Sequence, residues 1–177
     1  MHAFYDLEAA GITFDIIQFL LLSEVERVKT NCVSTHVIIV PRENNGCRPE
    51  DVGDESQSEL RVYNILVGCI QLLESASGFT VCSNRKDAKY YFEKANSKIF
   101  PAQYNVEKPI SRYLFGPIKE AIKGGYKWPS LTAPNFAKIY VKHFLKSFAN
   151  GKKVVSINLR TSSNQPVSYT HLRAHET

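Results

Sequence analysis

The feature that most constrains the fold is the alternation of strand and helix at the start of the chain. Residues 2–7 (HAFYDL) predict a buried strand, residues 14–29 predict a helix, and residues 34–40 (STHVIIV) predict a second strand, which Pro41 ends. Two strands joined through one helix lie parallel in a sheet, with a right-handed crossover. The chain therefore begins as a βαβ unit.

The first predicted helix has a start signal and an apolar stripe. Thr13 is a favourable N-cap, because its hydroxyl can accept a hydrogen bond from a backbone N–H of the first turn. Asp15 suits the positive end of the helix dipole. We expect one stripe to face the core, and it comprises Phe14, Ile17, Leu21, Val25 and Val28.

The same alternation continues along the chain. We expect strands at residues 79–82, 99–100 and 153–161, and helices at residues 59–73, 87–94 (capped by Ser83), 115–123 and 133–149. The expected buried face of the last helix contains Phe136, Ile139, Tyr140, His143, Phe144 and Phe148. This pattern predicts an α/β protein with a Rossmann-like, doubly wound and mostly parallel sheet that carries helices on both faces.

Composition limits the classes of function. With 44% hydrophobic residues the chain can bury a core, and it does not belong to the disordered class. The net charge is +5 and we find no compact basic run with interleaved aromatic residues, so we expect no nucleic-acid partner. A mildly basic surface suits an anionic small substrate or a membrane surface equally well. The most apolar run, residues 16–22, is too short to span a bilayer.

We therefore expect a cytoplasmic protein without a signal peptide or a transmembrane segment. A peripheral membrane contact and the oligomeric state stay open. No metal site is expected, because the four cysteines, Cys32, Cys47, Cys69 and Cys82, are widely separated and form no C-x-x-C pair. We expect the cysteines to be small buried side chains in a reducing compartment.

The end of the chain differs from the rest. Residues 167–177 (VSYTHLRAHET) resemble the translation of an adaptor used to prepare sequencing libraries, so we expect a non-native tail. Asn150-Gly151 is a helix-end signal and a candidate domain boundary. We therefore expect a Rossmann-like domain at residues 1–150 and the first strand of a truncated second domain at residues 151–166.

Polar residues at strand ends are the candidates for chemistry, since the sequence contains no complete catalytic motif. Arg160 and Thr161 follow a strand, where a guanidinium with neighbouring hydroxyls suits phosphate; the alternative is a surface ion pair. Asp6, Gly11 and Thr13 lie in or beside the loop after the first strand, where small residues admit a ligand and a helix N-terminus favours anions. Asp6 is a candidate general base or hydroxyl-binding carboxylate, or it caps a turn.

Three segments carry a resemblance to a known class of enzymes. FYDLEAAGITFDIIQFLLLSEVERV, HVIIVP and VVSINLRTSSNQP resemble uncharacterised bacterial proteins of glycosyltransferase type that are associated with surface or capsule polysaccharide. The arginine after the V-x-I-x-L strand is also similar to the strand–arginine element of fucosyltransferase-like enzymes, which have the two-domain GT-B fold.

The resemblance implies the N-terminal part of a nucleotide-sugar-dependent glycosyltransferase that acts in surface polysaccharide or glycan synthesis. Its substrates would be a nucleotide-sugar donor and a glycan acceptor, with no further cofactor. Arg160 would contact the diphosphate, Asp6 would take the proton of the acceptor hydroxyl, and the fragment alone would be inactive. Two alternatives are a non-catalytic nucleotide- or anion-binding α/β module and a partner-binding domain with Tyr and Phe patches at its interface.

Overall fold

The computed structural model describes residues 1–42, 59–95, 98–110, 116–125, 131–149 and 152–154. The chain divides into two compact units, Met1–Asn135 and Phe136–Thr177. The boundary expected at Asn150-Gly151 and most of the strand expected at 153–161 lie outside the described residues. The fold is therefore described mainly from the first unit.

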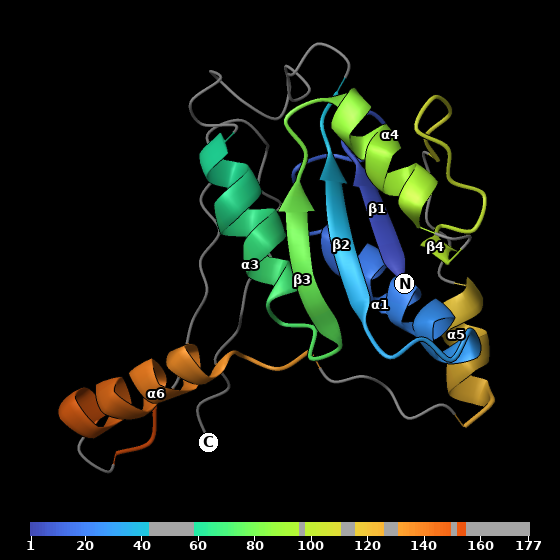
Figure 1. Ribbon diagram of the computed structural model, residues 1–177. Helices are drawn as coiled ribbons and strands as arrows, with labels where there is room; N and C mark the ends of the chain where they lie inside the picture. Colours follow the sequence, from blue (N-terminus) through green and yellow to red (C-terminus); the bar gives the residue numbers. More distant parts are fainter. Residues whose placement is uncertain (43–58, 96–97, 111–115, 126–130, 150–151, 155–177) are drawn as a thin grey trace, which may run out of the picture. The chain divides into compact units, whose positions relative to one another are not determined.

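The first unit contains a parallel sheet of four strands (Figure 1). The strands are β1 (His2–Asp6), β2 (Thr35–Val40), β3 (Ala76–Val81) and β4 (Ile99–Phe100), and their spatial order is β3-β2-β1-β4. Every pairing is parallel, and Asp6 at the end of β1 lies beside Val40 at the end of β2. This order confirms the predicted α/β class.

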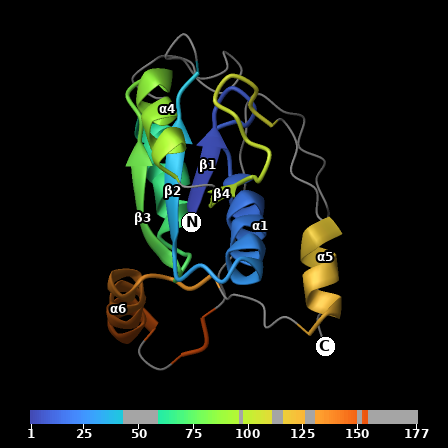
Figure 2. The same cartoon turned by 45° about the vertical axis from the view of Figure 1, so that its right-hand side comes forward.

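Helices cover both faces of the sheet (Figures 1 and 2). On one face, Ala3 and Tyr5 of β1 pack in a cluster with α1 (Ile16–Lys29) and with the helical segment η1 (Val62–Val67) and α3 (Gly68–Ile70). On the other face, Phe4 packs in a cluster with α4 (Arg85–Lys94). Because side chains alternate along a strand, β1 contributes to both clusters. The predicted doubly wound arrangement is confirmed.

The buried face of α1 differs from the predicted stripe. The helix begins at Ile16, two residues later than expected, and the Thr13 hydroxyl accepts the N–H of Asp15, which precedes the helix, at 3.3 Å. Phe14 precedes the helix and is 66% exposed. The buried positions are Ile16, Phe19, Leu20, Leu22, Ser23, Glu24 and Val25. Periodicity misplaced the stripe because most residues between 16 and 25 are apolar and several faces therefore match a helical period.

Two predictions around β3 are also wrong. The strand runs from Ala76 to Val81, so it begins three residues before the expected start at residue 79. The cap of α4 is Asn84 rather than Ser83, since the Asn84 side chain accepts the Asp87 N–H at 3.0 Å. Both residue types are favourable N-caps, so sequence alone did not separate the neighbours.

The remaining helices are α5 (Gly116–Lys123), α6 (Asn135–Phe144) and the π-helical η2 (Leu145–Ala149). α6 and η2 together cover most of the helix expected at residues 133–149, but the face of that helix expected to be buried is not buried. None of the side chains of α6 and η2 is buried, and His143 is exposed. Periodicity identified an apolar face but did not show whether another element covers it. Of the four cysteines, Cys32, Cys69 and Cys82 are buried free thiols as expected, and Cys47 lies outside the described residues.

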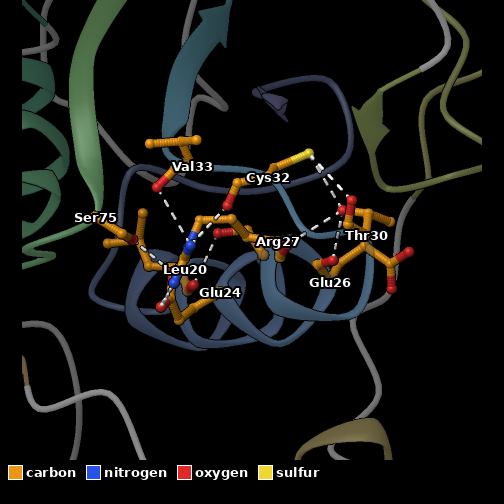
Figure 3. A network of polar contacts seen from close by, with 9 residues as sticks. Leu20, Glu24, Glu26, Arg27, Thr30, Cys32, Val33 and Ser75 are labelled. Atoms are coloured by element: carbon orange, nitrogen blue, oxygen red, sulfur yellow. Dashed lines mark hydrogen bonds and ion pairs between the residues drawn. The ribbon is translucent and has the colours of Figure 1, made fainter.

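A buried ion pair ties the end of α1 to the rest of the first unit (Figure 3). Arg27 binds both carboxylate oxygens of Glu24 at 2.7 Å and also donates to the backbone oxygens of Cys32 and Val33. Ser75, just before β3, donates to Glu24 at 2.5 Å. Burial alone would raise the pKa of Glu24, but the hydrogen bonds from Arg27 and Ser75 together with the positive charge of Arg27 outweigh burial, and the pKa lies below its ordinary value of 4.5.

We expect the Glu24–Arg27 pair to make the free energy of unfolding depend on pH below neutrality. Because the folded-state pKa of Glu24 is lowered, its contribution is present above the ordinary value of 4.5 and is lost as the pH falls through the lowered value. Glu24→Gln should cost about 2 kcal/mol at neutral pH and flatten the acid side of the profile. Urea unfolding across a pH series measures both effects, with Glu26→Gln on the same helix as the control. Parallel profiles for wild type and Glu24→Gln would contradict the assignment.

Candidate switch-point cavity

The candidate site lies where the course of the chain reverses. From β1 the chain moves through β2 to the edge strand β3, with its connections on one face, and then crosses the other face through α4 to β4. The loops that follow β1 and β4 therefore diverge at the carboxyl ends of adjacent strands. In open α/β sheets, ligands bind in the crevice at such a topological switch point.

A cavity of about 630 Å³ opens at this place, and we call it the switch-point cavity. Its volume is within the range of small-molecule sites. Three parts of the chain line it: Glu8 follows β1, residues 84–89 begin α4, and residues 106–109 follow β4. The full lining comprises Glu8, Asn84, Arg85, Lys86, Lys89, Val106, Glu107 and Pro109.

A network centred on Asp6 holds Arg85, which lines the cavity. The Asp6 carboxylate is 1% exposed and accepts both terminal nitrogens of Arg85 at 2.9 Å, one on each oxygen. Tyr104 donates its hydroxyl to the same carboxylate at 2.7 Å. Oδ1 also accepts the N–H of Glu8 at 2.9 Å, which is the turn-capping contact expected as the alternative. Four donors occupy the acceptor positions of an ionised carboxylate.

The electrostatics of this network keep the Arg85 guanidinium charged and the Tyr104 phenol neutral. Burial, the nearby charge of Asp6 and the hydrogen bond to it all raise the pKa of Tyr104, so the phenol remains a proton donor. The hydrogen bond to Asp6 raises the pKa of Arg85, although burial acts in the opposite direction. The Asp6 carboxylate thus holds a permanent cation and a neutral phenol.

The position of Arg85 explains why it needs this partner. Arg85 is the first residue of α4, and a cation at a helix N-terminus is disfavoured by the helix dipole. Its guanidinium is balanced by Asp6 and also donates to the backbone oxygens of Pro41 and Val106. One side chain therefore connects the ends of β1 and β2 with the loop after β4. Two members of this connection, Arg85 and Val106, line the cavity.

The charged side chains that could contact a ligand line the cavity outside the Asp6 network. Lys86 is exposed and forms no ion pair with any residue that the structure describes. Lys89 lies 3.4 Å from Glu107 in an exposed ion pair, which is weak and open to exchange with a ligand. Glu8 lies 3.6 Å from Arg42 in a partly exposed pair. Lys86 also lines a second cavity of about 440 Å³, together with Tyr90 and Tyr91.

The structure assembles only part of the predicted site. Asp6 does not line the cavity but binds Arg85, which does, and its role as a general base stays a prediction. Gly11 and Thr13 do not line the cavity; the Gly11 carbonyl accepts the hydroxyl of Tyr5, whose side chain packs on the α1 face. Arg160 and Thr161 lie outside the described residues.

Sequence reasoning missed Arg85, Lys86 and Tyr104. A signal for the first two was present, because they follow the third strand at the end where α/β sheets bind ligands. Tyr104 gave no such signal, since it lies in an irregular segment. Its role depends on the stacking of its ring on Phe4, with centroids 4.8 Å apart.

The described residues contain no group of three or more His, Cys, Asp or Glu side chains that could hold a metal ion. Within the same ranges, no helix has the length and apolar character needed to cross a membrane. Comparison with protein-family models, curated proteins and solved structures found no match to this chain. The function is therefore inferred from the site itself.

Proposed function

We propose that the first unit is a binding domain for a small anionic ligand of the nucleotide class. The observation that carries this proposal is the position of the cavity, which is lined by residues that follow β1, that begin α4 and that follow β4, where the doubly wound chain reverses. Nucleotides commonly bind at this position in sheets of this kind. The proposal assigns binding, and it assigns no reaction.

The chemistry of the lining supports a nucleotide rather than a purely apolar ligand. Lys86 and Lys89 provide ammonium groups for phosphate oxygens. Carboxylates at Glu8 and Glu107 are acceptors for sugar hydroxyls, and Val106 adds apolar surface for a base. A ligand with a charged, a hydroxylated and an apolar part matches the lysines, the carboxylates and the apolar side chain of the lining.

Calorimetric titration of the full chain with ADP, UDP and GDP tests the proposal. We expect at least one diphosphate to bind more tightly than its nucleoside, because the lysines contact phosphate. Lys86→Ala should weaken that binding by about tenfold or more, the usual effect of losing a hydrogen bond to a charged group. Lys29→Ala is the matched control, because Lys29 is an exposed lysine at the last turn of α1 and does not line the cavity.

The proposal fails if nucleotides and inorganic pyrophosphate show no binding, or if Lys86→Ala binds as well as wild type. The glycosyltransferase assignment stays a separate prediction, since Arg160 carries it and lies outside the described residues. A nucleotide-binding first unit is compatible with that prediction. Nucleotide binding by the first unit is equally expected if the protein is a non-catalytic nucleotide- or anion-binding module.

A further inference from the structure

The segment from residue 135 to residue 153 holds the whole net charge of the chain. The chain has 22 Lys and Arg residues against 17 Asp and Glu residues. Five of the lysines, and none of the acidic residues, lie in this segment, so the other 17 basic residues balance the 17 acidic ones. The five are Lys138, Lys142, Lys146, Lys152 and Lys153. The otherwise neutral chain thus has one strongly basic segment.

Aromatic residues follow the same helix at a regular spacing. Phe136, Tyr140, Phe144 and Phe148 are each four residues apart, so they form one row along α6 and η2. The rings of the last three lie close together, with centroids 6.4 Å apart for Tyr140 and Phe144 and 4.8 Å apart for Phe144 and Phe148. The row places four aromatic side chains on one side of the helix.

The lysines form a second row on the opposite face. Lys138, Lys142 and Lys146 share the four-residue spacing but are offset from the aromatic row by two residues. Two residues correspond to about 200° around a helix, so the two rows point away from each other. The result is an amphipathic helix with an aromatic face and a face whose charges are all positive.

Both faces are open to solvent. The four aromatic side chains of the row are 45% to 76% exposed, and Ile139, Val141 and Leu145 beside them are exposed as well. All five lysines are exposed. Contiguous exposed apolar surface of this kind marks an interaction site.

We infer that α6 and η2 bind the surface of an anionic lipid bilayer. The aromatic row lies at the boundary between headgroups and acyl chains, and the lysine row contacts anionic headgroups, as in interfacial helices. α6 and η2 have ten and five residues, fewer than the about 20 that a helix needs to span the hydrocarbon core, so they lie on the membrane and do not cross it.

The separation of the rows favours a membrane over other anionic partners. A single-stranded nucleic acid stacks its bases on aromatic side chains while cations on the same groove hold its backbone. Here the cations and the aromatic residues occupy opposite faces, so one strand cannot use both. A bilayer uses both because headgroup charge and apolar chains meet at its surface.

Vesicle sedimentation with the full chain tests the inference. We expect binding to vesicles of phosphatidylcholine mixed with phosphatidylserine, little binding to phosphatidylcholine alone, and release at high salt because salt screens the charges. The double change Lys138→Gln and Lys142→Gln should weaken binding by about 25-fold, since each lysine near an anionic surface contributes about fivefold. The matched control removes the exposed lysines Lys29 and Lys119 in the same way and should bind like wild type.

A second variant separates the aromatic contribution from the charge. Phe144→Ser should reduce vesicle binding by about tenfold or more, because it removes a large apolar side chain that binding to the bilayer would bury. Phe14→Ser, which changes an aromatic residue of 66% exposure in the first unit, should have no effect. Circular dichroism checks that each variant is folded.

Three outcomes would overturn the inference. The first is equal binding to neutral and anionic vesicles, or no binding to either. The second is binding to a single-stranded oligonucleotide that depends on both rows while vesicles are ignored. The third is self-association abolished by Phe144→Ser without any vesicle binding, which would assign the aromatic row to a second copy of the chain.

Discussion

Replacing Asp6 by alanine should lower the free energy of unfolding by about 3–5 kcal/mol, the usual cost of removing one partner of a buried ion pair. The side chain of Arg85 is 18% exposed and would lose both hydrogen bonds to the carboxylate. The buried hydroxyl of Tyr104 would lose its acceptor at the same time. Urea unfolding, with ellipticity as the signal, measures the loss.

Two further variants separate the network from a general effect of substitution. Glu8→Ala removes a partly exposed carboxylate two residues away and should cost no more than about 1 kcal/mol. Combining Asp6→Ala with Arg85→Met should recover part of the loss, because no buried charge is then left without a partner. If Asp6→Ala cost as little as Glu8→Ala, the network would not hold the first unit together.

The second large effect is expected at Phe4. Phe4→Ala should cost about 3–5 kcal/mol, because the side chain is fully buried and its loss leaves a cavity. The ring lies between two others, stacked on Tyr104 and edge-on to Phe92 at a centroid distance of 5.9 Å. The space left by the Phe4 ring would remove the stacking partner of Tyr104. We therefore also expect weaker ligand binding at the switch-point cavity.

Thermal and urea unfolding measure the effect, and a matched aromatic residue provides the control. Phe14→Ala should change stability by no more than about 0.5 kcal/mol, since that ring is 66% exposed. Phe4→Leu keeps most of the volume and should cost about 1.5 kcal/mol or less. Equal losses for Phe4→Ala and Phe14→Ala would show that the cluster around α4 contributes little.

The sequence was sufficient for the class of fold because its strands are short, apolar and separated by helical segments. HVIIV has side chains that suit a strand buried on both faces, and it is β2. The same reasoning failed for α1 and α6, where it found apolar faces but not what covers them. Phe14 and the aromatic row of α6 were expected in a core and are exposed. Periodicity reports which residues share a face, and burial depends on the other elements.

The candidate site was predicted from the sequence only in part. Asp6 was identified because it ends the first strand, and a strand end is a local property. Its partners are 79 and 98 residues away, at Arg85 and Tyr104, and no spacing pattern connects them. Likewise, Gly11 and Thr13 follow Asp6 closely in the chain, yet the cavity is lined by neither of them.

What the sequence by itself determined is thus the parallel α/β architecture and the carboxyl edge of β1 as a place for polar residues. Only the tertiary structure decided that Arg85, Tyr104 and Asp6 form one network and that Lys86 stays available beside it. The physical reason is that secondary structure follows local patterns of a few residues. A site at a switch point is made by strands whose order in the sheet differs from their order in the chain.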